Sequence, residues 1–122
     1  MSKITAAVVS SGRTVRVAPY VLASSGEERR AGLALIERYV IAAGLSLAEV
    51  SFADTGAPPP IDRRTGWRAV RRYAERGFAH GIVAIARPAI TTDVRVYEGL
   101  LTDLFVHRLF LALLPTEDSP GI

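Results

Sequence analysis

Apolar runs and amphipathic stretches alternate along the chain, which predicts alternating strands and helices. Strands are predicted over residues 14–23, 47–52, 80–87 and 105–114, and Pro115 ends the last of them. The run at 80–87, HGIVAIAR, is almost continuously apolar, as is typical of a central parallel strand buried on both faces. Residues 4–10, ITAAVVS, predict either a further short strand in a hairpin or a frayed N-terminal tail.

Three helices fill the intervals between these strands. They are predicted over Ser25–Ala43, over Arg64–Arg76, and from Thr91 or Thr92 to Asp103. Ser25 and Glu28 have the spacing of a capping box at the start of the first helix. The apolar positions at helical spacing, which should face the core, are Leu33, Ile36, Val40 and Ala43 in the first helix, Trp67, Val70 and Ala74 in the second, and Tyr97, Leu100, Leu101 and Leu104 in the third.

The alternation of strands and helices predicts an α/β fold. We expect a three-layer α/β/α sandwich with a mostly parallel sheet of four to five strands. Asp54–Asp62, DTGAPPPID, predicts a stiff surface loop, because its three consecutive prolines lack N–H donors. Ligands of such sheets bind beyond the carboxyl ends of the strands, which here are residues 24–26, 54–56 and 87–92.

Length and composition limit the classes of protein to which this chain can belong. We expect a single domain over 1–122, with 1–13 as an extra strand or tail and 115–122 as a loose tail. The chain has no cysteine and two separated histidines, His80 and His107, so no metal site is expected, and no glycine-rich phosphate motif indicates a cofactor. No apolar run approaches the roughly 20 residues of a membrane span. The N-terminus is a poor signal peptide, so a cytoplasmic protein without membrane contact is expected.

Arginine dominates the charge of the chain. The net charge is +3, the pI is about 9.8, and all of the 15 basic residues except Lys3 are arginines. Six of them cluster at the second predicted helix: Arg63, Arg64, Arg68, Arg71, Arg72 and Arg76. The cluster predicts either a solvated helix face, partly neutralised by Glu75, or a surface for nucleic acid phosphates or for an acidic protein.

Hydroxyl, carboxylate and guanidinium side chains lie at or just after the three predicted strand ends. Tyr20-Val-Leu-Ala-Ser24 closes the first strand, Asp54-Thr-Gly56 follows the second and precedes Arg64, and Arg87 follows the third. In order and spacing these segments resemble the catalytic domain of the serine recombinases, the resolvase/invertase family, over about residues 14–114. The resemblance implies a resolvase-like fold. It also implies that Ser24 stands where the family has its nucleophile, surrounded by the positions of Tyr20, Asp54, Arg64 and Arg87.

The sequence departs from the family at several of these positions. Family arginines are replaced by Leu22 and Ile90, the aspartate before Arg87 is Ala86, and the glutamine after the serine is Glu28. The family chemistry is attack on a DNA phosphodiester, for which guanidinium groups stabilise the charge that develops on the phosphoryl oxygens. Loss of one such contact typically costs about 10²–10³ in rate. We therefore expect Ser24 to be vestigial and the chain not to be an active enzyme.

Each retained residue also has a structural interpretation. Ser24 and Ser25 would serve as a turn and a helix cap, or as a residual anion site. Asp54 would be a turn residue that bonds its own backbone, and Tyr20 a core residue. Arg87, at the end of a buried strand, needs either a carboxylate such as that of Asp54 or a bound anion.

Two classes of function remain open. The chain ends soon after its last predicted strand, where the family continues into a dimerisation helix and usually a DNA-binding domain, so a degenerate and truncated relative is expected. Such a domain would be a non-catalytic interaction or regulatory module that binds a protein partner or forms a homodimer. Alternatively, it would be a DNA-binding accessory protein of recombination or mobile-element maintenance that uses the Arg64–Arg76 helix. An active recombinase or nuclease ranks last.

Overall fold

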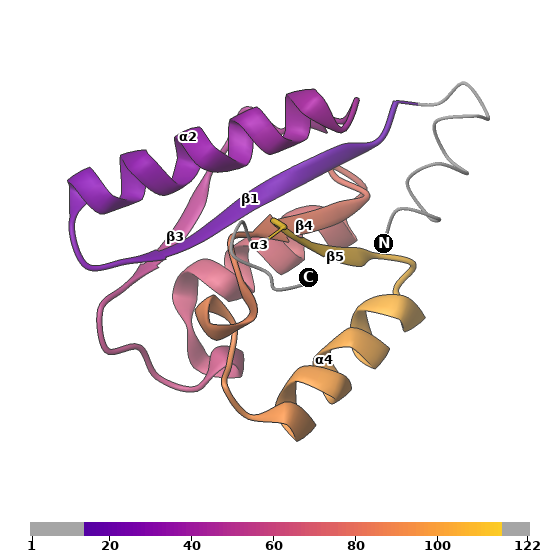
Figure 1. Cartoon of the computed structure of the whole chain (residues 1–122). Coiled ribbons are helices and arrows are strands. Elements are labelled where there is room, and N and C mark those ends of the chain that lie inside the picture. Colours follow the sequence, from indigo (N-terminus) through magenta and orange to yellow (C-terminus); the bar gives the residue numbers. More distant parts are fainter. Residues whose placement is uncertain (1–13, 116–122) are drawn as a thin grey trace, which may run out of the picture.

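The computed structural model describes residues 14–115, which build a sheet with helices on both faces (Figure 1). In chain order the elements are β1 (Arg16–Ala23), α2 (Gly26–Ala42), β2 (Ser46–Leu47), β3 (Phe52–Thr55), the 3₁₀ turn η1 (Ile61–Arg63), α3 (Thr65–Glu75), β4 (Gly81–Ala84), the 3₁₀ turn η2 (Arg87–Ala89), α4 (Val94–Val106) and β5 (Phe110–Leu113). The predicted α/β fold is confirmed.

β1 lies in the middle of the sheet, and every strand pair is parallel. On one side β1 pairs with β2 and then with β3, where Leu22 stands opposite Asp54. On its other side it pairs with β4, which in turn pairs with β5. Because all strands run the same way, their carboxyl ends meet at one edge of the sheet. This edge brings the ends of β1, β3 and β4 together.

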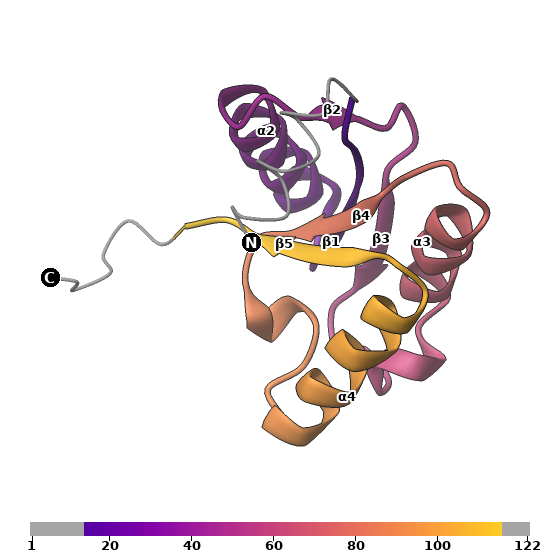
Figure 2. The same ribbon diagram turned by 90° about the vertical axis from the view of Figure 1, so that its right-hand side faces the viewer.

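The helices cover the two faces unequally. In Figures 1 and 2, α2 lies alone on one face, and α3 and α4 lie together on the other. The core on the α2 side is built around Val17, Val21, Ile36, Val40 and Val83. The core on the α3–α4 side is built around Tyr20, Trp67, Val70, Ile82 and Leu104. Alternate residues of β1 therefore point into different cores, as the twofold period of a strand requires.

The helix starts follow the local sequence. The Ser25 hydroxyl accepts a hydrogen bond from the Glu28 N–H at 3.1 Å, so Ser25 is the N-cap of α2 as predicted. At α4 the N-cap is Asp93, whose Oδ1 accepts from the N–H groups of Arg95 and Val96, and the predicted cap at Thr91 or Thr92 is wrong. Aspartate is favoured over threonine as the N-cap here because its carboxylate also interacts favourably with the positive end of the helix dipole.

Two predicted strands have other boundaries. Residues 47–52 do not form one strand: β2 ends at Leu47, β3 begins at Phe52, and β3 continues to Thr55. Asp54 therefore lies in a strand, because the proline run that forbids pairing begins only at Pro58. The last predicted strand, 105–114, begins too early, since Phe105 and Val106 belong to α4 and a turn with Arg108 at a φ of 61° precedes β5.

The remaining differences between the predicted and the observed elements are small. The apolar stripe of α4 is predicted to include Leu101, but 37% of this residue is exposed. Strand β4 ends at Ala84, so Arg87 lies in η2 and not at the end of a strand. The predicted strand over 4–10 lies outside the described residues, as does nearly all of the predicted tail.

Candidate functional site

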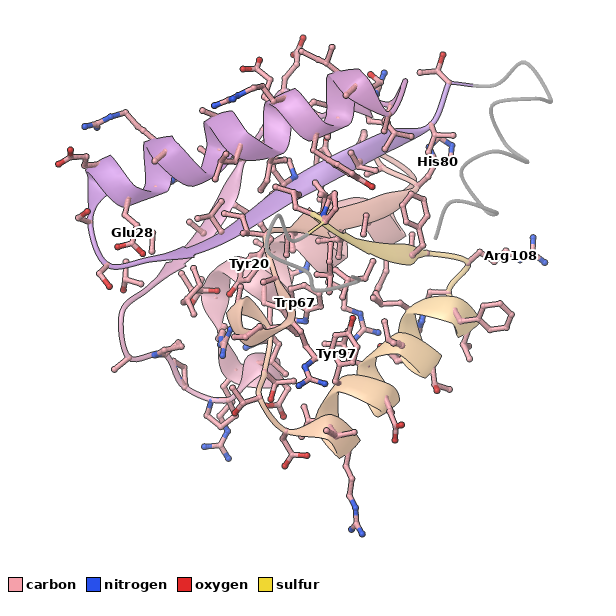
Figure 3. The ribbon with its side chains drawn as sticks, in the orientation of Figure 1. Tyr20, Glu28, Trp67, His80, Tyr97 and Arg108 are labelled. Carbon is pink, nitrogen blue, oxygen red and sulfur yellow. The ribbon has the colours of Figure 1, made fainter. Side chains whose placement is uncertain are left out.

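Tyr20, Asp54 and Arg64 meet in the interior, on the side of the sheet that carries α3. The neighbouring strands β1 and β3 place Tyr20 and Asp54 so that the phenol Oη donates to Asp54 Oδ2 at 2.8 Å. Arg64 Nη1 lies 3.4 Å from the same Oη and donates to it. Tyr20 is fully buried, and its ring meets that of Trp67 edge-on with centroids 5.3 Å apart (Figure 3).

Asp54 also holds the start of α3. Its Oδ1 accepts from the Gly66 N–H and its Oδ2 from the Trp67 N–H, both at 2.9 Å. These N–H groups belong to the first turn of the helix and have no partner within it. Glycine is required at 66 because a Cβ there would lie 2.1 Å from the carbonyl oxygen of Ala53. Asp54 thus serves as a helix cap supplied by a neighbouring strand.

Arg64 is a buried clamp between two surface segments. Only 7% of the residue is exposed. Its Nε donates to the carbonyl of Pro59 at 2.9 Å, and its Nη1 to the carbonyl of Ala89 at 2.7 Å. The guanidinium therefore fixes the proline loop before η1 against the turn η2. The sequence predicted Arg64 as one of a cluster of arginines on a phosphate-binding surface. In the structure its side chain is instead buried.

The surroundings of Tyr20 disfavour its ionised form. Burial, then the hydrogen bond and the charge of Asp54, raise the pKa of Tyr20 to about 12, although Arg64 acts in the opposite direction. The phenol is consequently a neutral hydrogen-bond donor at any physiological pH. Tyr20 therefore has a structural role, since its hydroxyl bridges the charged side chains of Asp54 and Arg64.

Ser24 lies outside this network. It is exposed, just beyond the end of β1, and none of the hydrogen bonds among the described residues joins it to Tyr20, Asp54 or Arg64. Leu22 is half-buried, and Ile90 is fully buried in the core that contains Tyr20. These are the two positions at which the resemblance to serine recombinases implies arginine. Both positions could be identified from the sequence, but the burial of Ile90 could not.

Arg87 does not pair with Asp54. It is exposed on η2, and its guanidinium carbon lies 5.9 Å from the centre of the Tyr97 ring on α4. This distance is typical of a cation–π contact. The alternative of an Asp54 partner, which assumed that Arg87 ends a buried strand, is therefore wrong because β4 stops three residues earlier.

The arginine cluster of the sequence divides into three groups. Arg64 is buried, and Arg71 bonds to Glu75 at 2.6 Å and also to Asp103 on α4. The exposed members are Arg63, Arg68, Arg72 and Arg76. Within residues 14–115, none of these four has an ion-pair partner within 4.0 Å. The exposed basic surface is therefore smaller than the sequence predicted.

A groove of about 840 Å³ lies between α3 and α4, where Arg71 reaches across to Asp103. Its walls come from η1, α3 and the first three turns of α4, and they include Trp67, Arg68 and Leu100. This groove could not be predicted from the sequence, because it is formed by segments about 30 residues apart whose packing no local pattern specifies. The only sequence signal was the arginine cluster on one wall.

Other site chemistry is limited in the described part of the chain. No group of three or more histidine, cysteine, aspartate or glutamate side chains there could hold a metal ion. Nδ1 of His80 accepts from the backbone N–H of Arg16 at 3.0 Å. His107 follows the last turn of α4, where its Nδ1 lies 2.9 Å from the carbonyl oxygen of Asp103. Among residues 14–115, no helix is long and apolar enough to cross a membrane.

Comparison with known proteins gives a match at the level of structure. No protein-family model matches this sequence, and no curated protein sequence matches it either. The crystal structure of the C-terminal catalytic domain of ISC1926 TnpA, an IS607-like serine recombinase, superimposes with a TM-score of 0.69. The match covers 84% of this chain and 71% of that one, at 13% sequence identity. The chain therefore has a fold like that of a serine recombinase catalytic domain.

Proposed function

We propose that this chain is a non-catalytic domain with the serine recombinase fold, and that it acts by binding other macromolecules. The observation that supports this most is that the guanidinium groups expected from the resemblance are either replaced or bonded to backbone carbonyls. Two family arginine positions hold Leu22 and Ile90, and a third, Arg64, spends its Nε and Nη1 on the carbonyls of Pro59 and Ala89. Charge on a phosphoryl group at Ser24 would therefore lack the guanidinium groups of these three positions, and only Arg87, which is exposed, would remain.

The retained residues have a structural explanation that needs no catalysis. Asp54 caps α3, Tyr20 bridges Asp54 and Arg64, and Arg64 joins two loops. A chain that lost cleavage would still keep these three side chains, since removal of a partner leaves a buried polar group unsatisfied. Retention of the family pattern at these positions therefore follows from folding.

Cleavage of supercoiled plasmid DNA tests the proposal. The wild-type chain and a Ser24→Ala variant should both leave the plasmid supercoiled, and neither should form a covalent protein–DNA adduct on a denaturing gel. An adduct or nick that appears with wild type and disappears with Ser24→Ala would show that Ser24 is an active nucleophile and would overturn the proposal.

A second candidate function, nucleic-acid binding without cleavage, is favoured by the spacing of exposed arginines on α3. Arg68, Arg72 and Arg76 follow each other at four-residue intervals, so about 6 Å of helix rise separates each from the next. Like charges at this spacing repel each other along the helix. An anionic strand alongside α3 would relieve that repulsion.

Binding to a labelled DNA duplex at two salt concentrations tests this candidate. If α3 makes three phosphate contacts, a triple Arg68/Arg72/Arg76→Ala variant should make the negative slope of log affinity against log salt shallower by about 3. Arg29, Arg30 and Arg38 on α2 are also exposed, and their triple alanine variant is the matched control that removes the same charge elsewhere. Equal salt slopes for wild type and the triple variant would exclude α3 as the contact surface.

A further inference from the structure

One flank of α4 is apolar and uncovered in the described part of the chain. Val94, Leu101 and Phe105 lie on this flank at helical spacing, and they are 51%, 37% and 76% exposed. Of the 13 residues of α4, only Leu104 is buried. A helix that is apolar on most of its sides is usually covered on most of them. This flank of α4 therefore lacks the contact that its composition indicates.

A hollow of about 370 Å³ adjoins this flank, between α4 and β5. Leu101 and Phe105 of α4 line it, as do Leu111 and Leu113 of β5. Every residue of its lining is leucine, phenylalanine or tyrosine, and the hydroxyl of Tyr97 is the one polar side-chain group among them. Sites for small molecules generally present several placed polar groups. An apolar protein side chain is therefore the occupant that suits this hollow.

The sheet is open at the same place. β5 is the last strand in the sheet order of residues 14–115, and Figure 2 shows α4 beneath it. The sequence of β5, Phe110–Leu113, contains no charge and no proline, which are the residues that commonly protect an edge strand from pairing. The flank of α4, the hollow and the open strand together form a surface that we call the α4–β5 edge.

The apolar part of the α4–β5 edge is complementary to itself. Phe105 is exposed beside the hollow that Leu101 lines, so two copies related by a twofold axis would each present an aromatic ring to the hollow of the other. In two antiparallel copies of one helix, residues at equal distances from the midpoint lie opposite each other. Leu101 and Phe105 are equally far from Asp103, whose side chain is directed to Arg71 on α3 and leaves the flank apolar.

The charges at the two ends of this edge are complementary under the same symmetry. Glu98 and Arg108 are also equally far from Asp103, so each would lie opposite the other in the second copy. Both are exposed, and within residues 14–115 neither has an ion-pair partner within 4.0 Å. Arg108 projects away from the body of the molecule at the turn between α4 and β5 (Figure 3). One axis therefore matches the apolar and the charged positions together.

We propose that the α4–β5 edge binds the same edge of a second copy of this chain, with the two α4 helices antiparallel about a twofold axis at the level of Asp103. Phe105 of each copy enters the other's hollow, and Glu98 of each copy pairs with Arg108 of the partner subunit. The axis is perpendicular to the sheet, so the two β5 strands also meet antiparallel at their open edges. This inference goes beyond the proposed function and does not depend on whether Ser24 is active.

Sedimentation equilibrium of the full chain at about 1–100 μM tests for the dimer and measures its dissociation constant. Phe105→Ala should weaken the dimer about tenfold or more, because aromatic side chains at the centre of an interface contribute most of its affinity. Val106→Ala is the matched control. Val106 is 70% exposed on a different side of α4, so its substitution should change the dissociation constant less than about twofold. Equal effects of the two substitutions would contradict this surface.

Charge reversal tests the antiparallel arrangement. Glu98→Arg and Arg108→Glu should each weaken the dimer about fivefold or more, because each places like charges opposite one another at both ends. The double variant should restore the dissociation constant to within about twofold of wild type. Glu37→Arg and Arg38→Glu make the same charge changes at exposed positions of α2 and should have little effect. Failure of the double variant to restore association would refute the proposed pairing.

A chain that stays monomeric over this concentration range overturns the proposal. If Phe105→Ala then lowers the urea midpoint of the monomer, a segment of the same chain covers the hollow, and if it does not, the hollow is left to a different protein. A monomer that leaves plasmid DNA uncut refutes the dimer alone. A covalent adduct at Ser24 refutes the non-catalytic assignment whatever the state of association.

Discussion

At the scale of single residues, the Asp54 side chain joins its own strand β3 to β1 and to α3. It accepts from a phenol on β1 and from two N–H groups at the start of α3. Asp54, Tyr20 and Arg64 could be identified as candidate site residues from the sequence alone, because their order and spacing resemble those of serine recombinases. Their mutual bonding could not be predicted, because it depends on the pairing of β1 with β3 and on the entry of α3 beneath them.

We predict that Asp54→Asn destabilises the fold by about 1–3 kcal/mol, because an amide group cannot accept at both side-chain positions and leaves a donor unsatisfied. Urea unfolding at neutral pH measures the change. Asp62→Asn is the matched control, since Asp62 is exposed and its substitution should stay within about 0.5 kcal/mol. Equal effects of the two substitutions would contradict a structural role for Asp54.

Tyr20 gives the fold a pH dependence in the alkaline range. The pKa of Tyr20 rises from 10.0 to about 12 on folding, so the unfolded chain loses this proton first. The folded state binds the proton more tightly, and its contribution to stability is complete below pH 10 and is lost as the pH rises towards 12.

Urea midpoints between pH 9 and pH 12 should therefore fall more steeply for wild type than for Tyr20→Phe. The phenylalanine variant will be less stable at neutral pH because Asp54 loses a donor, so the slope against pH is the informative quantity. Parallel slopes would show that Tyr20 does not contribute to the alkaline loss of stability.

At the scale of elements, the sequence predicted where helices lie better than where short strands end. Periodicity over 11 or more residues defines α2, α3 and α4. It cannot divide 47–52 into β2 and β3, because the break between them is set by pairing with β1 at two separate registers. It also cannot assign Phe105 and Val106, since an apolar run fits either the end of a helix or the start of a strand.

Two glycines in helices test the packing of these elements. Gly66→Ala should cost more than 2 kcal/mol, roughly the scale of overpacking in a core, because its Cβ would meet the Ala53 carbonyl at 2.1 Å. Gly99→Ala on α4 meets nothing within 4 Å and should stabilise by about 0.5–1 kcal/mol through helix propensity. Thermal unfolding compares the two, and a stable Gly66→Ala variant would refute the close approach of α3 to β3.

At the scale of the whole molecule, the alternation of strands and helices was enough to predict a parallel sheet covered on both faces. The unequal division of the helices, with one on one face and two on the other, was not predictable. It depends on the order in which strands join the sheet, and the groove between α3 and α4 exists because both lie on the same face. The surface available for binding is thus a property of topology.

The central position of β1 has a consequence for biosynthesis. Of the strands that the structure describes, a ribosome releases β1 first, but the contact of Arg16 with His80 on the β4 side spans 64 residues. Until β4 emerges, one edge of an almost wholly buried strand has no neighbour, and parallel pairing over such separations is intrinsically slow. We expect the nascent chain to be prone to association at this stage and to benefit from chaperones that bind extended apolar segments.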